Sequence, residues 1–200
     1  MEKGGYSSLE DDYIRIIKPS DDKRDLNPRH VFFPALLAGL SITVIAYFWD
    51  ITQYGILFAS FGSSAFILYV SPKTNQAQVR NILGAYPLAG FFGYLSSSYI
   101  LPYINFPDAA FDYAITGGVA VMLTVLAMLF TRFEHGPAAG AALAFVINEP
   151  DVIAVFLLIG GGITLLIIAR ILIFVVKEEY ELECAIRHTL HLGSEEPNNR

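Results

Sequence analysis

The sequence predicts an all-α membrane protein with six transmembrane segments, and three observations carry this prediction. Hydrophobic residues make up 54% of the 200 residues, charged residues make up only 16%, and the mean hydropathy is +0.49. A water-soluble domain of this length is usually more polar. The apolar residues gather in six blocks, and positive residues fall between alternate blocks, as expected of a chain that crosses a membrane repeatedly.

The two ends of the chain have the composition of solvated segments. Residues 1–30 mix Asp and Glu with Lys and Arg, which fits neither a signal peptide nor a transit peptide. We therefore expect the mature chain to start near Met1. The predicted organisation is a cytoplasmic N-terminal segment over 1–30, a transmembrane domain over 31–176 and a cytoplasmic tail over 177–200.

Three of the six apolar blocks have the length and composition of ordinary spanning helices, namely the first, the fourth and the sixth. The third carries Pro87, Gly90 and Gly93, which predicts a kink or a close helix contact. In chain order the blocks are Val31–Trp49, Tyr54–Val70, Ile82–Leu101, Phe111–Phe130, Pro137–Ile147 and Val152–Val176.

The second and fifth blocks are unusual. The second has the small residues Gly62, Ser63, Ser64 and Ala65 at its middle, where large apolar residues would normally face lipid. The fifth, between Arg132 and Glu149, is barely long enough to cross a bilayer as a regular helix. We therefore expect a short or broken helix at each of these two places.

The positive residues predict the topology. Lys and Arg near the ends of spans are held on the cytoplasmic side, and here they precede the first block, lie between the second and third and between the fourth and fifth, and follow the sixth. The remaining loops contain acidic residues only. This pattern favours six crossings of a plasma or inner cell membrane with both termini in the cytoplasm. Lys73 and Arg132 are equally explained as interfacial anchors, and Arg170 as a snorkelling side chain.

An internal repeat would make the two halves inverted in the membrane. An offset of about 78 residues superimposes four Gly or Pro pairs, of which one or two are expected by chance. The pairs are Gly39 with Gly117, Gly62 with Gly140, Pro72 with Pro150 and Gly84 with Gly162. The hypothesis is a pair of inverted three-helix repeats, and in transporters built this way interrupted helices at equivalent positions mark the substrate site.

Three stretches resemble the HPP family of small integral membrane proteins. The stretch 78–86, Gln-Val-Arg-Asn-Ile-Leu-Gly-Ala-Tyr, resembles the family's Gln-Pro-Arg-Asn-(apolar)2-Gly-Gly-His, and 61–65, Phe-Gly-Ser-Ser-Ala, resembles Phe-Gly-Ala-Ser-Ala. The stretch 135–143, His-Gly-Pro-Ala-Ala-Gly-Ala-Ala-Leu, resembles the His-Pro-Pro-Ala-Gly-Ala-Thr-Ala-Leu that names the family. Val79, Tyr86, Gly136, Ala139 and Gly140 depart from these patterns. Members in photosynthetic organisms are linked to nitrite transport, so the resemblance implies a transporter of small anions.

The same residues are compatible with an anion path. If Pro137 is the first residue of a helix, the backbone N–H groups of Ala138, Ala139 and Gly140 are unsatisfied and attract an anion. Small residues of the second block would let the ion approach, hydroxyls would donate to it, and Arg80 would draw it to the cytoplasmic mouth. The predicted substrate-binding residues are Gly62, Ser63, Ser64, Arg80, Asn81, His135, Pro137, Ala138, Ala139 and Gly140.

The same residues could also serve the structure of the protein alone. Small residues in membrane helices often serve close packing, and Gly160-Gly161-Gly162 fits a flexible or tightly packed helix. His135 fits equally well a loop histidine bonded to a backbone carbonyl. The rival function is a structural or assembly subunit whose small-residue helices dock against a partner. A single wet cavity lined by the polar residues would favour transport, and separate placement around a dry centre would favour the subunit.

Several function classes find no support in the sequence. It has no nucleophile elbow, no His-Glu-x-x-His and no pair of carboxylates within the apolar blocks, so we expect no enzyme and no cofactor. The basic patch that nucleic acid needs is missing. If 177–192 is helical, one face carries Glu181, Cys184, His188 and His191, a weak metal signal that an amphipathic cytoplasmic helix explains better. The expected partners are a nitrite-like anion, the lipid bilayer and further copies of the chain.

Overall fold

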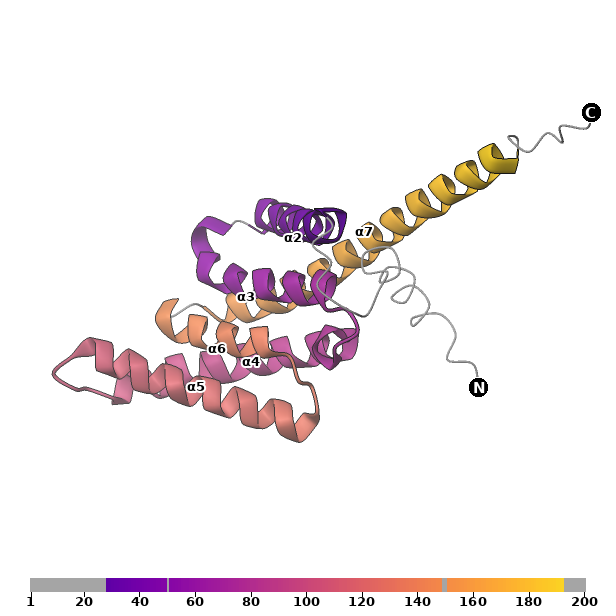
Figure 1. Ribbon diagram of the computed structural model, residues 1–200. Helices are drawn as coiled ribbons and strands as arrows, with labels where there is room; N and C mark the ends of the chain where they lie inside the picture. The colour runs from indigo at the N-terminus through magenta and orange to yellow at the C-terminus, as the bar shows by residue number, and fades with distance from the viewer. Residues whose placement is uncertain (1–27, 50, 149–150, 193–200) are drawn as a thin grey trace, which may run out of the picture.

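The computed structural model describes residues 28–49, 51–148 and 151–192, and within these ranges every regular element is a helix (Figure 1). Two short 3-10 turns, η1 (Asn75–Ala77) and η2 (Leu101–Tyr103), lie in the connections. The six α-helices are α2 (Pro28–Phe48), α3 (Ile51–Val70), α4 (Val79–Tyr99), α5 (Ala109–Thr131), α6 (Gly136–Asn148) and α7 (Val152–Leu192). Each predicted apolar block therefore forms one helix.

The prediction of a short or broken second helix is wrong, because α3 is a continuous helix of 20 residues. Ser60 Oγ bonds back to the helix, donating to the Leu57 carbonyl at 2.7 Å, and Ser64 Oγ has the Ser60 carbonyl within reach at 3.2 Å. Such bonds satisfy hydroxyls inside a helix without interrupting it. The fifth helix is short as predicted, since α6 has 13 residues.

Among the described residues, two helices are long and apolar enough to cross a membrane by themselves. They are Ala109–Thr131, with a mean hydropathy of 2.1, and Val152–Lys177, with 2.8. Shorter apolar helices run over Phe32–Phe48, Leu57–Val70 and Gly136–Asn148. The apolar helices agree with a membrane protein.

The last helix extends beyond its predicted end at Val176. The backbone of α7 is helical over 41 residues to Leu192, so the predicted tail helix forms as a continuation of the sixth block. The tail side chains expected on one face (Glu181, Cys184, His188 and His191) lie outside the described side chains, as do residues 1–27 of the predicted N-terminal segment 1–30.

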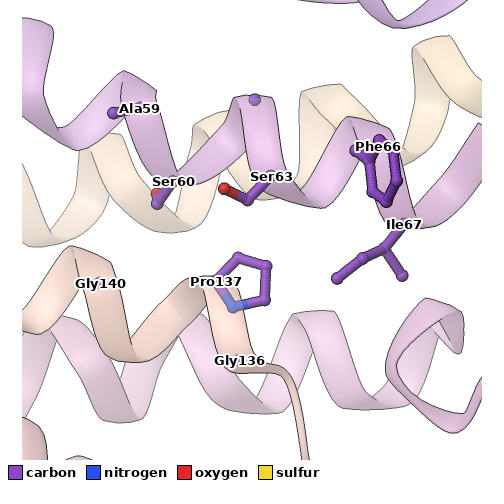
Figure 2. A pocket seen from close by; sticks show the side chains of 9 residues that line it. Ala59, Ser60, Ser63, Phe66, Ile67, Gly136, Pro137 and Gly140 are labelled. Carbon is purple, nitrogen blue, oxygen red and sulfur yellow. The ribbon is translucent and has the colours of Figure 1, made fainter.

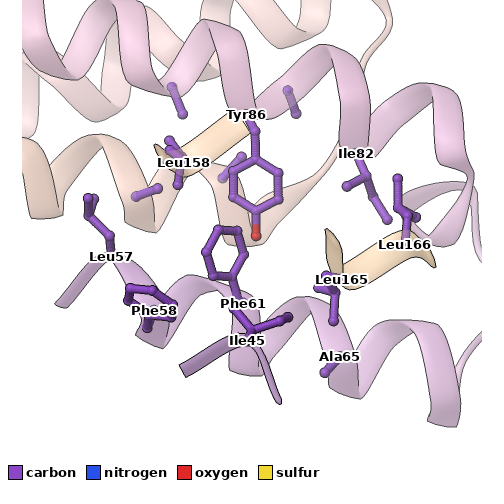
Figure 3. Packing of buried hydrophobic residues seen from close by; sticks show 14 of the residues in the cluster. Ile45, Leu57, Phe58, Phe61, Ala65, Ile82, Tyr86, Leu158, Leu165 and Leu166 are labelled. Atoms are coloured by element: carbon purple, nitrogen blue, oxygen red, sulfur yellow. The ribbon is translucent and has the colours of Figure 1, made fainter. Parts of the chain in front are cut away.

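The helices form two layers (Figure 1). In the front layer α2, α3, α6 and α5 lie side by side, and α7 and α4 lie behind them. Behind this layer α4 contacts α5, α6 and α7, while α7 also contacts α2 and α3. The core lies where α3, α4 and α7 meet, around Phe61, Tyr86 and Leu158 (Figure 3).

Glycines allow close helix packing both between the two layers and within the rear layer. A Cβ atom on Gly93 of α4 would lie 2.8 Å from Phe145 Cβ and 2.9 Å from the Ala142 carbonyl oxygen of α6. A Cβ on Gly162 of α7 would lie 2.9 Å from the ring of Tyr86. Helices that approach this closely cannot accommodate a side chain at the crossing. Tight packing, one of the two expectations for the triple glycine, is therefore confirmed at Gly162.

The connections alternate between the two ends of the bundle (Figure 1). The connection 71–78 and the connection 132–135 lie at one end and touch each other through Gln76 and His135. The connection 100–108 lies at the other end, as does the start of α7. Lys73, Arg80 and Arg132 therefore lie at the first end of the bundle, and the acidic residues Asp108, Asp112 and Asp151 lie at the second.

Candidate functional site

A groove runs between α3 and α6 on the front face of the bundle. It encloses about 790 Å³. Figure 2 shows the side chains of Ser60, Ser63 and Pro137 directed into the space between the two helices. The lining residues are Ala59, Ser60, Gly62, Ser63, Phe66 and Ile67 from α3, and Gly136, Pro137 and Gly140 from α6.

The glycines of the groove do not serve close packing. A Cβ atom on Gly62 or on Gly140 would meet no other atom within 4 Å, in contrast to Gly93 at the layer crossing. The missing side chains therefore widen the groove. These two positions are also the pair that the 78-residue offset superimposes, and the structure brings them to the same surface.

The groove carries hydroxyl groups of two kinds. Ser60 is buried and its hydroxyl already donates to the Leu57 carbonyl. Ser63 is exposed to the groove, and its hydroxyl has no hydrogen-bond partner among the residues that the structure describes. Ser63 is therefore the hydroxyl that a polar ligand in the groove would meet first.

A buried hydrogen-bond chain lies directly behind the groove. Ser64 Oγ is 2.7 Å from Tyr86 Oη and 2.7 Å from His135 Nε2. On the other side of the ring, His135 Nδ1 is 2.8 Å from the backbone carbonyl of Gln76. The chain joins α4, α3, the connection before α6 and the turn η1.

Which atoms can only accept determines the donor in each of these hydrogen bonds. A carbonyl oxygen only accepts, so His135 carries a proton on Nδ1 and donates it to Gln76. In the neutral imidazole Nε2 then accepts, and the Ser64 hydroxyl is its donor. Ser64 Oγ in turn accepts from the Tyr86 hydroxyl. The bond from His135 to a backbone carbonyl, one of the two expectations for this histidine, is thus present in the structure.

Burial keeps His135 neutral. The side chain is 1% exposed, and this burial lowers its pKa from 6.5 to about 4, while the bond to the Gln76 carbonyl acts in the opposite direction. Removing an imidazolium from water is costly, whereas the neutral ring is fully bonded here. At neutral pH the ring is therefore uncharged.

The predicted row of free N–H groups at the start of α6 is wrong. The helix begins at Gly136, so Pro137 is its second residue. The Gly136 N–H donates to Gln76 Oε1 at 3.2 Å, and the Ala138 N–H donates to the His135 carbonyl at 3.1 Å. Ala139 and Gly140 stand where the regular i→i−4 ladder of such a helix starts. Gln76 therefore occupies the helix end that we expected to hold an anion.

Arg80 and Asn81 lie at the same end of the bundle but outside the groove. Asn81 is buried and its Nδ2 donates to the Asn75 carbonyl at 2.6 Å, which fixes the turn that carries Gln76. Arg80 is exposed, with its guanidinium 5.2 Å from the centre of the Phe133 ring. A Cβ on Gly84 would also meet Phe133. This part of the motif holds the connection before α6 in place.

The structure thus divides the predicted site into three parts. Gly62, Ser63, Pro137 and Gly140 line the groove; Ser64, His135 and Asn81 are buried behind it; Arg80 lies on the surface, and Ala138 and Ala139 belong to the body of α6.

Two participants were not predicted. Tyr86 is only a departure from a motif in the sequence, and its partner Ser64 is known from the structure. Gln76 gave no signal, because its partners are 59 and 60 residues away in the chain.

Comparison with known proteins identifies the family of the chain. No solved structure matches the chain. A curated transmembrane protein of Dictyostelium discoideum is 32% identical over 96 residues, which is 48% of this chain and 32% of that protein. The chain thus spans about a third of the length of this relative. The family model for the HPP transmembrane region matches residues 23–181. This range includes the residues of the groove and of the buried hydrogen-bond chain behind it. The protein belongs to the HPP family of membrane proteins.

Proposed function

We propose that this protein transports a small inorganic anion, with nitrite as the first substrate to test, and that the anion passes through the groove between α3 and α6. The observation that carries the proposal is a groove kept open by two glycines and offering the hydroxyl of Ser63, which has no hydrogen-bond partner among the described residues. Small side chains let an ion approach the helix, and a hydroxyl replaces part of its hydration.

The distribution of charge supports an anion as the substrate. Lys73, Arg80 and Arg132 lie at the end of the bundle where α6 begins, and positive charge at a mouth raises the local concentration of anions. The acidic residues lie at the other end. By the positive-inside rule this arrangement favours a cytoplasmic mouth near His135, six crossings and both termini in the cytoplasm.

The packing of the helices supports an inverted repeat. If α2, α3 and α4 are exchanged with α5, α6 and α7, each of the main helix contacts has a counterpart. The contact α2 with α3 corresponds to α5 with α6, α4 with α6 corresponds to α7 with α3, and α4 with α5 corresponds to α7 with α2. The contact α3 with α6 corresponds to itself, so the groove lies on the proposed axis. Repeat interfaces are where transporters of this kind bind substrates.

A second candidate is an assembly subunit that docks a partner helix, and the openness of the same groove favours it. Gly62, Gly140 and the exposed Phe66 form a surface that another helix, including one from a second copy, would fill. The internal bonding of His135 and Asn81 also fits this candidate, because neither side chain faces the groove.

Flux measurements separate the two candidates. We expect purified protein in liposomes to take up nitrite, and uptake of nitrate, formate and chloride measures selectivity. Gly62→Leu and Gly140→Leu should lower the flux by at least about tenfold, since the new side chain fills the groove. Gly118→Leu is the matched control, because Gly118 also has open space around it but lies on α5, away from the groove.

The outcomes of the flux experiment distinguish between the two candidate functions and test the assigned path. Absence of flux for all four anions would favour the assembly subunit. Flux that survives both groove substitutions would place the anion path elsewhere, and equal loss in Gly118→Leu would mean that the groove variants act through folding.

A further inference from the structure

We propose that the buried chain Tyr86–Ser64–His135 is a proton-binding site that couples anion passage to the uptake of one proton, so that the protein is a proton–anion symporter. This proposal rests on the proposed function and adds the identity of its coupling ion. It is carried by the hydrogen-bond geometry around Ser64 and by the position of that geometry against the groove.

The Ser64 hydroxyl has two acceptors within reach. One is His135 Nε2 at 2.7 Å, and the other is the Ser60 carbonyl at 3.2 Å. When the imidazole is neutral, Ser64 donates to Nε2. When a proton from water binds Nε2, the ring donates to Ser64 Oγ, and the hydroxyl turns to donate to the Ser60 carbonyl.

Both protonation states therefore leave no donor unsatisfied. The hydroxyl of Tyr86 donates to Ser64 Oγ in each state, and His135 Nδ1 donates to the Gln76 carbonyl in each state. The two arrangements differ by one bound proton and the rotation of one hydroxyl. A buried histidine with a single bonding pattern would lack this property.

The proton site lies against the wall of the groove. Ser63 precedes Ser64, Gly136 follows His135, and Ser60, the alternative acceptor, lies one turn away; Ser60, Ser63 and Gly136 all line the groove. The ring therefore lies beside the lining of the groove, since His135 and Ser64 are each adjacent in sequence to a lining residue. A positive charge on the ring and an anion in the groove attract each other, so bound anion and bound proton increase each other's affinity by the same factor.

The neighbouring ionisable groups do not replace His135 in this role. From α4 the ring faces Tyr86, from α3 it faces Ser64, and from η1 it faces the Gln76 carbonyl. The charged side chains at this end, Lys73, Arg80, Arg132 and Glu134, are exposed. Burial lowers the pKa of His135 to about 4, so the site is empty of its proton until an anion arrives.

The test uses nitrate, because nitrous acid crosses lipid bilayers in its neutral form. Liposomes contain the wild-type protein and an entrapped pH-sensitive dye, and nitrate is added outside. The symporter acidifies the lumen as nitrate enters, and its initial rate rises by about tenfold or more between pH 7.5 and pH 5.5. Since one proton accompanies each anion, an imposed membrane potential does not change the rate.

Two variants place the effect at the proposed site. His135→Gln keeps a hydrogen-bonding side chain but holds no proton, so nitrate flux should lose its pH dependence and its acidification. His30→Gln, a change at another histidine of the sequence, is the control, and it should behave like the wild type. A folded His135→Gln protein is recognised by an unchanged elution volume in detergent.

The outcomes separate this proposal from the one beneath it. Nitrate flux without lumenal acidification, or with a rate that follows the membrane potential, would overturn proton coupling and leave anion transport standing. Flux in His135→Gln that still acidifies the lumen would place the proton elsewhere and overturn the assignment. Absence of all anion flux would overturn the proposed function and proton coupling together.

Discussion

At the residue scale the site depends on Ser64, which joins three elements through one oxygen atom. It contacts Tyr86 of α4 and His135 before α6 while belonging to α3. The sequence motifs indicate Ser64 and His135 as site residues, and Tyr86 is a departure from the family's pattern. They could not show that the three side chains meet, because the meeting depends on bonds across 22 and 71 residues.

Replacing Ser64 should destabilise the protein more than replacing its neighbour. Ser64→Ala leaves the Tyr86 hydroxyl and His135 Nε2 buried with fewer partners, which costs about 1–3 kcal/mol. Ser63→Ala is the control, since that hydroxyl is exposed and unbonded, and it should change stability by less than about 0.5 kcal/mol. Thermal unfolding in detergent measures both, and equal effects would contradict the role given to Ser64.

The stability of the protein should fall in mildly acidic solution because of His135. Its pKa is about 4 when folded and 6.5 when unfolded, so the unfolded chain binds the extra proton more readily. Stability is therefore fully present above pH 6.5 and is lost as the pH falls from 6.5 towards 4, by about 3 kcal/mol in total.

The matching variant isolates this contribution. His135→Gln has no proton to bind, so the difference in unfolding midpoint between it and the wild type should shrink as the pH is lowered through this window. A difference that stays constant from pH 7 to pH 4.5 would contradict the buried neutral histidine.

At the element scale the helices α3 and α6 show what a sequence pattern can and cannot predict. Hydrophobicity placed all six helices and the shortness of α6, because apolar length is a local property. The continuity of α3 was missed, since small polar residues are compatible with a helix when their hydroxyls bond back to it.

The start of α6 was missed for a different reason. With 13 residues α6 is about 20 Å long, against about 32 Å for α4 with 21, and its first turn is contacted by another element. That element is η1, whose Gln76 side chain takes the first free N–H of the helix. A cap supplied from a distant turn has no local signature.

The crossing of α4 and α6 should tolerate no added methyl group. Gly93→Ala places a Cβ against Phe145 and Ala142 of α6 and should destabilise the protein by about 1–3 kcal/mol. Gly118→Ala has open space and should be neutral or stabilising by about 0.5–1 kcal/mol, because alanine favours a helix. Unfolding midpoints of the two variants test this prediction. An unchanged midpoint in Gly93→Ala would contradict the packing of α4 on α6.

At the scale of the whole molecule the two layers of described helices leave a groove between the small-residue segments of α3 and α6. The composition and the charge pattern predicted the class and the alternation of the loops, because both follow from the bilayer as a solvent. The arrangement of the helices in two layers could not be predicted from the sequence, since it depends on which glycines contact which side chains. The family match and the apolar helices agree with a membrane protein, and the groove is the proposed path of the anion.

The central claim is that an anion passes Ser63 in the groove, and one measurement tests it most directly. The chain has a single cysteine, so Cys184→Ser gives a background in which Ser63→Cys is the only thiol. A small, negatively charged thiol reagent added to liposomes should react with Ser63→Cys, abolish nitrite flux, and react more slowly when nitrite is present. A thiol that reacts fully and leaves the flux unchanged would contradict an anion path through this groove.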